Sequence, residues 1–307
     1  MDQTPTLQLS CDTLPARQAF LVAALHLRSS TSLAPAAPRV TLTIRMAESL
    51  TNRLEFAKAI AREAGEITLR YFGRDNYQVE LKEDTSPVTI ADREAEQHLR
   101  QRIAAEFPTD GILGEELGEQ AGTSGYRWIL DPIDGTKSFI SGVPLYGTLV
   151  GVERGERSVI GVIHIPGLRE TAYAAVGSGA WHLRGDATPQ PARVSAKRTL
   201  AEGLLCTSDV EGFAVTGRKS AFERLEAAAR LTRTWGDCYG YLLVASGRAE
   251  AMVDPRMSVW DCAALQPILE EAGGTFTDWH GTPTIYASES VGSNRFVLEE
   301  VLSLLCT

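Results

Sequence analysis

Apolar residues recur at helical spacing in two stretches of the chain. Residues 56–71 place apolar side chains three or four positions apart, which predicts an amphipathic helix that ends near Gly73. Residues 90–107 predict a second helix. Thr89 and Asp92 stand at the spacing of a capping box, so we expect the second helix to begin at this point.

Runs typical of β-strands follow in the first half of the chain. The run 126–130 ends at an Asp-Pro pair, and the runs 149–152 and 159–165 flank the polar tetrapeptide 153–156. A polar tetrapeptide with glycine between two such runs is typical of a β-hairpin. With a further strand at 171–176, these runs predict that an antiparallel sheet follows the two helices.

The second half has a different rhythm, in which short apolar runs alternate with helical patterns. Ser220 and Glu223 would open one helix, and the two glycines after residue 272 would close another. A short run lies at 232–235, strands are predicted over residues 204–208 and 249–253, and helices over residues 220–231, 239–245 and 260–272. This alternation indicates an α/β layer.

The change of rhythm falls near residues 185–191. We therefore expect an α+β domain over residues 46–186 and an α/β domain over residues 187–307. Residues 1–45 stand apart, with ten Ser or Thr, four Arg, two Asp and no Glu. That composition is typical of an organellar transit peptide. We favour the alternative of an extension upstream of Met46, and in both cases expect a disordered or dispensable leader.

Composition narrows the class of protein. Apolar residues make up 44% and charged residues 22% of the 307, which argues against disorder, collagen and coiled coil. The formal net charge of -9 argues against sequence-independent nucleic-acid binding, which needs a basic face. No apolar run reaches about 18 residues, so we expect no membrane span. Five scattered cysteines without a CxxC pair favour a reducing compartment.

The segment 131–136 (Asp-Pro-Ile-Asp-Gly-Thr) carries the first candidate chemistry. It places Asp131 and Asp134 three residues apart after a predicted strand, and Gly135 permits a tight turn. Both carboxylates can then face one point, beside the N–H groups of Gly135 and Thr136 and the threonine hydroxyl. Hard oxygen ligands next to free donors suit Mg²⁺ together with a phosphate ester. For this motif alone, a turn capped by aspartate is the alternative.

Two further acidic motifs become informative because of the order in which they occur along the chain. Glu115 and Glu116 follow an Ile-Leu-Gly, and Asp261 stands at a predicted helix start, after Trp260 and before an Ala-Ala pair. Each alone fits a solvated surface or a helix cap. Together with the segment 131–136 between them, they resemble the inositol monophosphatase superfamily, and the resemblance covers about residues 50–300.

The resemblance implies a fold, an activity and a set of metal ligands. It implies a layered αβαβα sandwich and a magnesium-dependent phosphomonoesterase, usually a homodimer, with two or three Mg²⁺ per site. The implied ligands are Glu115, Asp131 and the carbonyl of Ile133 for one metal, and Asp131, Asp134 and Asp261 for the second. Lys82 and Asp92 match positions beside a third, weaker metal, with a surface lysine and a capping box as the alternatives.

The resemblance also implies catalytic roles. Gly135 and Thr136 would hold the phosphate, while Thr136 and Glu115 would orient a metal-bound water for in-line attack, with Asp131 bridging both metals. Elementary electrostatics agrees, because carboxylates within ~4 Å of each other repel by several kcal/mol per pair at an effective dielectric near 20. Cations or protons must neutralise them. The first domain would thus bind metal and phosphate, and the second would complete the substrate site.

The substrate is expected to be L-histidinol phosphate. The segments 137–144 and 236–241 resemble the histidinol-phosphatase branch of the superfamily. Asp254 stands seven residues before Asp261, where family members carry a substrate-binding acid. The ammonium and imidazole of this substrate can pair with carboxylates such as Asp237 and Asp254. A helix cap is the alternative for Asp237.

Other readings of the chain stay open. Inositol 1-phosphate, a nucleotide bisphosphate or a sugar bisphosphate would use the same metals, and a non-catalytic metal- or phosphate-binding regulator would keep the fold without the reaction. A small phosphate monoester is the expected partner, with neither nucleic acid nor membrane. We expect a cytoplasmic protein, or an organellar one if residues 1–45 are a transit peptide.

Overall fold

A computed structural model describes residues 38–74, 79–81 and 87–306 of the chain. The predictions for the first 37 residues and for Lys82 lie outside these described residues. Residue contacts divide the chain into one unit that ends at Ala47 and a second unit from Glu48 to Thr307. The second unit contains both regions that we predict as separate domains, and the division at residue 186 stays a prediction.

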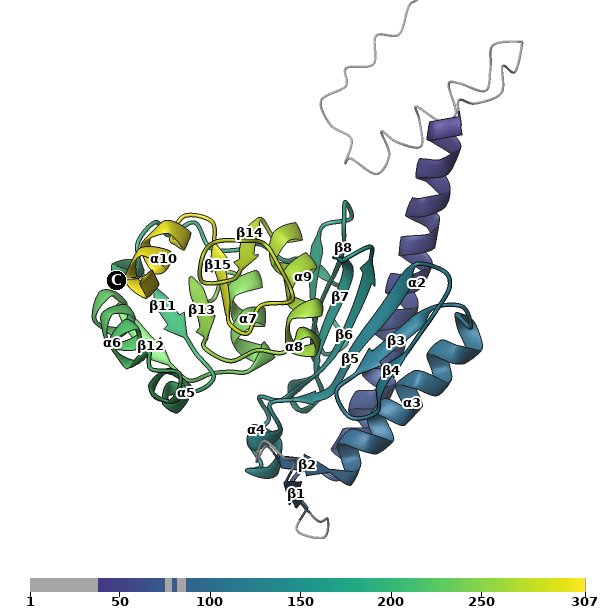
Figure 1. Ribbon diagram of the computed structural model, residues 1–307, viewed down its shortest axis with the longest axis horizontal. Helices are drawn as coiled ribbons and strands as arrows, with labels where there is room; N and C mark the ends of the chain where they lie inside the picture. Colours follow the sequence, from purple (N-terminus) through teal and green to yellow (C-terminus); the bar gives the residue numbers. More distant parts are fainter. Residues whose placement is uncertain (1–37, 75–78, 82–86, 307) are drawn as a thin grey trace, which may run out of the picture. The chain divides into compact units, whose positions relative to one another are not determined.

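An eight-stranded sheet comes from the first half of the chain (Figure 1). Its order is β10-β9-β8-β7-β6-β5-β3-β4, and all neighbours are antiparallel except β3 and β5. The strands are β3 (Gly111–Gly114), β4 (Gly118–Gln120), β5 (Tyr126–Asp134), β6 (Gly147–Arg154), β7 (Arg157–Ile165), β8 (Glu170–Ala175), β9 (Ala180–Arg184) and β10 (Gln190–Pro191). The predicted hairpin is formed by β6 and β7.

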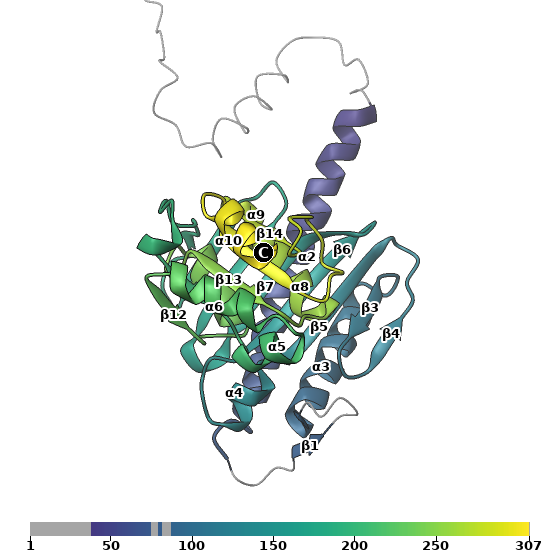
Figure 2. The same cartoon turned by 60° about the vertical axis from the view of Figure 1, so that its left-hand side comes forward.

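Two long helices cover one face of this sheet (Figure 2). They are α2 (Pro38–Leu69) and α3 (Ile90–Glu106), and α3 begins with the predicted capping box of Thr89 and Asp92. Successive strand residues point to opposite faces, so Trp128 and Leu130 of β5 pack under these helices while Ile129 faces the other way. The short strands β1 (Val79–Leu81) and β2 (Pro87–Thr89) pair with each other before α3.

A five-stranded sheet comes from the second half, in the order β12-β11-β13-β15-β14. Its strands are β11 (Leu204–Cys206), β12 (Leu231–Arg233), β13 (Ala251–Asp254), β14 (Gly274–Thr277) and β15 (Ser290–Asn294). Strand β11 is parallel to β12 and β13, and β15 is antiparallel to its neighbours. Its outer face packs on α5 (Val210–Val215), α6 (Lys219–Ala228) and α10 (Leu298–Cys306).

The middle layer lies between the two sheets and completes the αβαβα order. It consists of α7 (Cys238–Ala245), α8 (Val259–Ala263) and α9 (Leu265–Glu271), whose apolar side chains share one core with the inner faces of both sheets. Helix α4 (Thr136–Ile140) and the 3-10 turns η1 (Pro166–Leu168) and η2 (Leu200–Glu202) complete the chain. Within the described ranges, no helix combines the length and apolar character needed to cross a membrane.

Three local predictions were wrong. The single helix over residues 260–272 is two helices, because Pro267 has no N–H to give to the carbonyl of Ala263, which instead accepts the Ser158 hydroxyl at 2.5 Å. Helix α6 begins at Lys219, with no side-chain cap from Ser220. Strand β5 continues through Asp134, so the Asp-Pro-Ile-Asp segment lies at the end of a strand rather than after it.

Candidate active site

Strand β5 aims Asp131 at the middle layer of helices. Side chains alternate along a strand, so Asp131 shares the face of Ile129, which packs in the core around α7 to α9. The pairing of β5 with β6 shifts register between Asp131 and Asp134, and this irregularity brings the second carboxylate to the same side. Gly135 then takes φ +84°, in the left-handed region that favours glycine, and α4 begins.

Helix α8 brings a third carboxylate from 130 positions along the chain. Ser258 caps this helix, and the Asp261 side chain accepts the Ser258 N–H at 2.7 Å in a capping box. Glycines let the helix lie close to the sheet: a Cβ at Gly151 would stand 2.7 Å from the Cβ of Ala263, and a Cβ at Gly161 only 2.0 Å from the carbonyl oxygen of Ala264. Asp261 is placed by this close approach.

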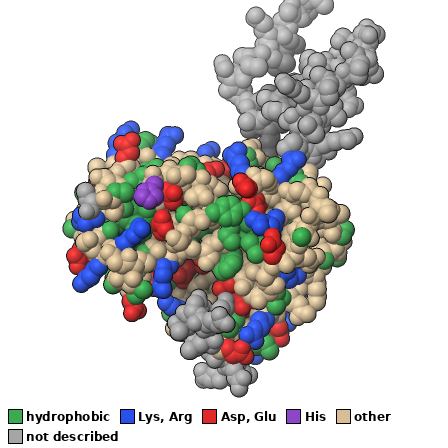
Figure 3. All heavy atoms as spheres, in the orientation of Figure 1, with side chains coloured by type: hydrophobic (Ala, Val, Ile, Leu, Met, Phe, Trp, Pro, Cys, Tyr) green, Lys and Arg blue, Asp and Glu red, His purple; other side chains and the backbone are tan. Residues whose placement is uncertain are grey.

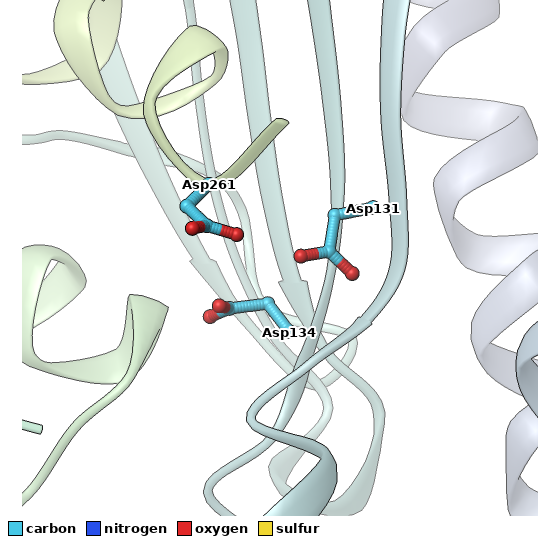
Figure 4. Close-up of side chains that lie close together, drawn as sticks. All are labelled: Asp131, Asp134 and Asp261. Atoms are coloured by element: carbon cyan, nitrogen blue, oxygen red, sulfur yellow. The ribbon is translucent and has the colours of Figure 1, made fainter. Parts of the chain in front are cut away.

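Asp131, Asp134 and Asp261 form one cluster, with a carboxylate oxygen of each within 4.8 Å of the others (Figure 4). Burial, and then the charges of Glu115, Asp134 and Asp261, raise the pKa of Asp131 well above its usual value. Burial, followed by the charges of Asp237 and Asp261, does the same to the pKa of Asp134. Burial raises the pKa of Asp261 to about 7, with a smaller contribution from Glu115.

Glu115 lies beside this cluster, at the turn between β3 and β4. Its N–H donates to the carbonyl of Leu130 at 3.2 Å, which ties the turn to β5 one residue before Asp131. Its charge is close enough to raise the pKa of both Asp131 and Asp261. The structure therefore brings together the four carboxylates that the sequence singles out.

The carbonyl of Ile133 and the start of α4 lie next to the cluster. Ile133 donates its N–H to Asp131 Oδ1 at 3.1 Å, and its carbonyl accepts the Thr136 hydroxyl at 3.1 Å. Gly135 allows a close approach, because a Cβ there would stand 2.5 Å from Asp237 Oδ2. The backbone of residues 135–136 and the threonine hydroxyl thus border the acidic cluster.

Asp237 joins the site from the segment before α7. It occupies the N-cap position of this helix but makes no side-chain capping bond, so the alternative of a helix cap finds no support in the structure. The next N–H, of Cys238, donates to Asp134 Oδ2 at 2.5 Å. Burial raises the pKa of Asp237, while a hydrogen bond from Ser208 and the charge of Lys137 oppose this.

Asp254 lies at the end of β13 and is buried under the site. Its carboxylate accepts hydrogen bonds from the Thr207 hydroxyl, the Ser208 N–H and hydroxyl, and the Tyr241 hydroxyl, at 2.7–3.2 Å. Burial raises its pKa to about 6. A carboxylate offers about four acceptor positions. Asp254 therefore supports Ser208 and Tyr241 and has little capacity left for a ligand.

A cavity of about 760 Å³ is lined by four of these carboxylates, those of Asp134, Asp237, Asp254 and Asp261. Carboxylates are visible in a recess near the middle of the face in Figure 3. Its mouth carries three charged residues: Asp209 accepts a bond from Arg256 at 2.7 Å, and Lys137 stands 3.8 Å from Asp209. Lys137 belongs to the segment 137–144 that follows Thr136, whereas the sequence analysis missed Asp209 and Arg256, for which only the position of Arg256 two residues after Asp254 was a signal.

The donor set of the cluster fits a hard divalent cation. Every side-chain donor is a carboxylate oxygen, as Mg²⁺ or Mn²⁺ prefers. In the part of the chain that the structure describes, no lysine or arginine forms an ion pair with the three aspartates, so their charge is not balanced by protein cations. The raised pKa values express this imbalance, which a bound cation would remove.

Comparisons with known proteins agree with this site. A model of the inositol monophosphatase family matches residues 49–306. The chain is 46% identical to a histidinol-phosphatase of Chlorobaculum parvum over 80% of its length and 92% of that protein. It is 35% identical to a fructose-1,6-bisphosphatase/inositol-1-monophosphatase of Thermotoga maritima, over 83% and 96%. A crystal structure of the suppressor protein suhB from Bartonella henselae superposes with a TM-score of 0.77 at 29% identity, over 83% and 99%.

Proposed function

The chain belongs to the inositol monophosphatase family and is a phosphoric monoester hydrolase, and we propose that its substrate is L-histidinol phosphate. The products would be L-histidinol and inorganic phosphate. The observation that carries this proposal is an acidic side chain, Asp237, that borders the phosphate-side glycine of a carboxylate-lined cavity without serving as a helix cap. The similarity to the Chlorobaculum parvum enzyme supports it.

We propose that divalent cations, in the cell Mg²⁺, are held at the acidic cluster. Glu115, Asp131 and the carbonyl of Ile133 would hold one, and Asp131, Asp134 and Asp261 the other. When bound, the cations would lower the pKa of water and offset the negative charge of the phosphoryl group. Without cations the same carboxylates repel each other, and burial together with this repulsion raises the pKa of Asp131 and of Asp134 above the usual value.

The remaining groups position the phosphate. The N–H groups of Gly135 and Thr136 stand at the start of α4, where backbone donors suit a phosphate oxygen. The Thr136 hydroxyl, which donates to the Ile133 carbonyl, and the Glu115 carboxylate would orient the attacking water, and the proton would go to the carboxylate. Pro132 and the left-handed Gly135 fix the backbone between them, so little reordering is needed when substrate binds.

The cationic end of the substrate would meet Asp237. A hydrogen bond between charged groups contributes roughly 1.5–3 kcal/mol, so this pair would favour an amino-imidazole over a polyol by about 10–150-fold. Asp254 would attract the same cationic end as a buried negative charge, without contacting it, and it also holds Ser208 and Tyr241 in place. An inositol ring would leave the Asp237 carboxylate without an ionic partner.

The experiment that tests the proposal compares phosphate release from L-histidinol phosphate and inositol 1-phosphate with Mg²⁺. We expect the higher kcat/KM for L-histidinol phosphate. A higher value for inositol 1-phosphate would overturn the substrate while leaving the phosphatase intact. Fructose 1,6-bisphosphate belongs in the same panel, because Lys137 and Arg256 at the cavity mouth could pair with a second phosphate, and a relative of 35% identity carries that activity in its name.

The proposal also covers the oligomeric state and the cellular compartment of the protein. We expect a homodimer in the cytoplasm, the first from the family resemblance and the second from cysteine usage. The described cysteines, Cys206, Cys238, Cys262 and Cys306, are all free thiols, which suits a reducing compartment. Light scattering on the purified protein should give about twice the 33.3 kDa chain mass.

A further inference from the structure

The turn that carries Glu115 is held by a buried acid of helix α3. Glu96 is fully buried, and its two carboxylate oxygens accept the N–H of Glu116 at 2.8 Å and the N–H of Leu117 at 3.1 Å. These two N–H groups belong to the residues directly after Glu115. A single side chain thus ties the backbone on one side of Glu115, while the Leu130 carbonyl ties the N–H of Glu115 itself.

The residue before Glu115 makes room for this contact. A Cβ at Gly114 would stand 2.1 Å from Glu96 Oε1 and 2.4 Å from its carboxyl carbon, far inside van der Waals contact. Only glycine lets the strand end lie directly on the carboxylate. In the Gly-Glu-Glu motif, Gly114 must therefore lack a side chain because Glu96 lies against it, and Glu115 lies beside the acidic cluster.

Arg100, one turn further along α3, completes the support. It donates from Nε to Glu96 Oε1 at 2.7 Å and from Nη2 to the carbonyl of Gly118, at the other end of the turn. The guanidinium balances the charge of a carboxylate that would otherwise be costly to bury. Glu96 and Arg100 together hold residues 116–118 by three backbone groups.

The contrast with Asp92 shows what Glu96 does. Asp92 lies four positions earlier on the same helix face and is equally buried, but among the described residues its Oδ1 has no hydrogen-bond partner. The hydrogen bonds of Glu96, by comparison, link it to the turn and to Arg100. Acceptance of two N–H groups requires a carboxylate, because an amide would present its own N–H to one of them.

We propose that Glu96 is a positioning residue that presents the Glu115 carboxylate to the cation at the acidic cluster. The inference rests on the proposed function, in which Glu115 is a metal ligand. Groups that orient a metal ligand typically change metal affinity or activity by about 10–100-fold when they are replaced. Glu96 itself touches neither substrate nor the reacting atoms.

The test measures Mn²⁺ binding by the full chain without substrate, with free Mn²⁺ counted by electron paramagnetic resonance. E96Q should weaken binding by about 10–100-fold. E106Q is the matched control, because Glu106 lies on the same helix with an exposed side chain, and it should bind as the unmodified chain does. R100K keeps the charge but cannot bridge Glu96 and Gly118 together, and it should weaken binding by a smaller factor.

Two further measurements separate positioning from general stability. Hydrogen exchange should be faster in E96Q within residues 114–118 and unchanged in the rest of the eight-stranded sheet. In the phosphatase assay, E96Q should need more Mg²⁺ than the unmodified chain for half-activation.

Three outcomes are decisive. A folded E96Q that binds Mn²⁺ as tightly as the unmodified chain overturns the inference. If E96Q does not fold, R100K decides, and unchanged Mn²⁺ affinity together with unchanged exchange at residues 114–118 overturns it as well. If the unmodified chain binds no Mn²⁺ at all, the proposed function fails first, so the two failures are distinguishable.

Discussion

At the scale of single residues, the site concentrates negative charge where water is scarce. Asp131 and Asp134 are 2% and 8% exposed, and each lies beside at least one other acid. Each accepts one hydrogen bond from a backbone N–H, of Ile133 and of Cys238, which stabilises the charge only in part. The three aspartates of this cluster could hold a metal ion.

Asp131 should be the most sensitive of the metal ligands. The proposal gives it to both cations, so Asp131→Asn should lower kcat/KM for L-histidinol phosphate on the order of 10³-fold, since a metal ion contributes several kcal/mol to the transition state. Steady-state assays over a range of Mg²⁺ concentrations measure this loss. Full turnover by the variant, or by the unmodified chain in excess chelator, would contradict the two-metal site.

Asp237 should decide between substrates rather than drive the reaction. Asp237→Ala should lower kcat/KM for L-histidinol phosphate by about 10–150-fold, because an ionic hydrogen bond is lost, and change p-nitrophenyl phosphate much less. Asp186→Ala serves as control, since Asp186 is an exposed acid in the connection between β9 and β10. Equal losses for both esters would show that Asp237 serves the metals or the fold.

At the scale of elements, glycines set how closely helices approach the sheets. Gly151 on β6 and Gly161 on β7 lie under the junction of α8 and α9, and Gly65 on α2 lies against His164 of β7, where a Cβ would stand 2.7 Å from the ring. Helix α8 carries Asp261 at its first turn. The distance between α8 and the eight-stranded sheet therefore sets how far Asp261 lies from Asp131 and Asp134.

Gly161→Ala should damage both stability and metal binding. The new methyl would lie 2.0 Å from the carbonyl oxygen of Ala264, so α8 must move, at a cost of about 1–3 kcal/mol or more in the free energy of unfolding. Denaturant unfolding and Mn²⁺ binding measure the two effects. Gly111→Ala, whose nearest atom would be 3.2 Å away, is the milder comparison. Undiminished Mn²⁺ affinity in a destabilised variant would show that Asp261 is placed independently of this contact.

Glu170 links three elements and should make the fold sensitive to acid. It lies on β8 and binds His182 and Arg184 of β9 and Arg248 after α7, at 2.6–3.1 Å. Burial alone would raise its pKa, but the hydrogen bond from His182 and the charge of Arg248 outweigh burial and hold the pKa at about 2. The contribution to stability is thus present above the ordinary pKa of 4.5 and is lost as pH falls toward 2.

The predicted test compares the unmodified chain with E170Q. At pH 5 or above, the ion pairs should make the unmodified chain more stable by up to about 3 kcal/mol, and this difference should shrink as pH falls from 4.5 to 2. Urea unfolding at several pH values in this window measures it. A difference that does not depend on pH would mean that the carboxylate charge is not the source of the stability.

At the scale of the whole molecule, the site lies where the two halves of the chain meet. The turn after β3 supplies Glu115, β5 supplies Asp131, and α8 of the second half supplies Asp261. Both halves share one core with α7 and α9 between the sheets. Assembly of the site thus depends on long-range packing within the unit from Glu48 to Thr307.

Removal of residues 1–45 should leave this unit intact. The deletion takes away the first residues of α2, but the first buried apolar side chain among those described is Leu54. We expect a change in melting temperature of less than about 2 °C, as for surface changes in a domain of this size, and unchanged kcat/KM. Differential scanning calorimetry measures the first. A much larger fall would show that these residues pack on the unit.

Features that depend only on neighbouring residues were predictable from the amino-acid sequence. The capping box at Thr89, the hairpin of β6 and β7 and the left-handed glycine after Asp134 are local features, and each was predictable from residues a few positions apart. The acidic motifs indicated the family because all three occur in one order along the chain, whereas each alone also fits a solvated surface, a capped turn or a helix cap.

Other features depend on strand register and on how closely helices pack on the sheets, and these could be seen only in the folded structure. The sequence could not show that Asp254 is already bonded to Ser208 and Tyr241, because those partners come from separate elements of the second half. Pro267 is a local signal that the helix over residues 260–272 divides, but the sequence could not show that the freed carbonyl of Ala263 accepts the Ser158 hydroxyl, 105 positions away. The physical reason is that propensity and capping act over one or two turns, whereas the meeting of Asp131 with Asp261 is set by the alternation of β5 and by glycines that admit α8 to the sheet.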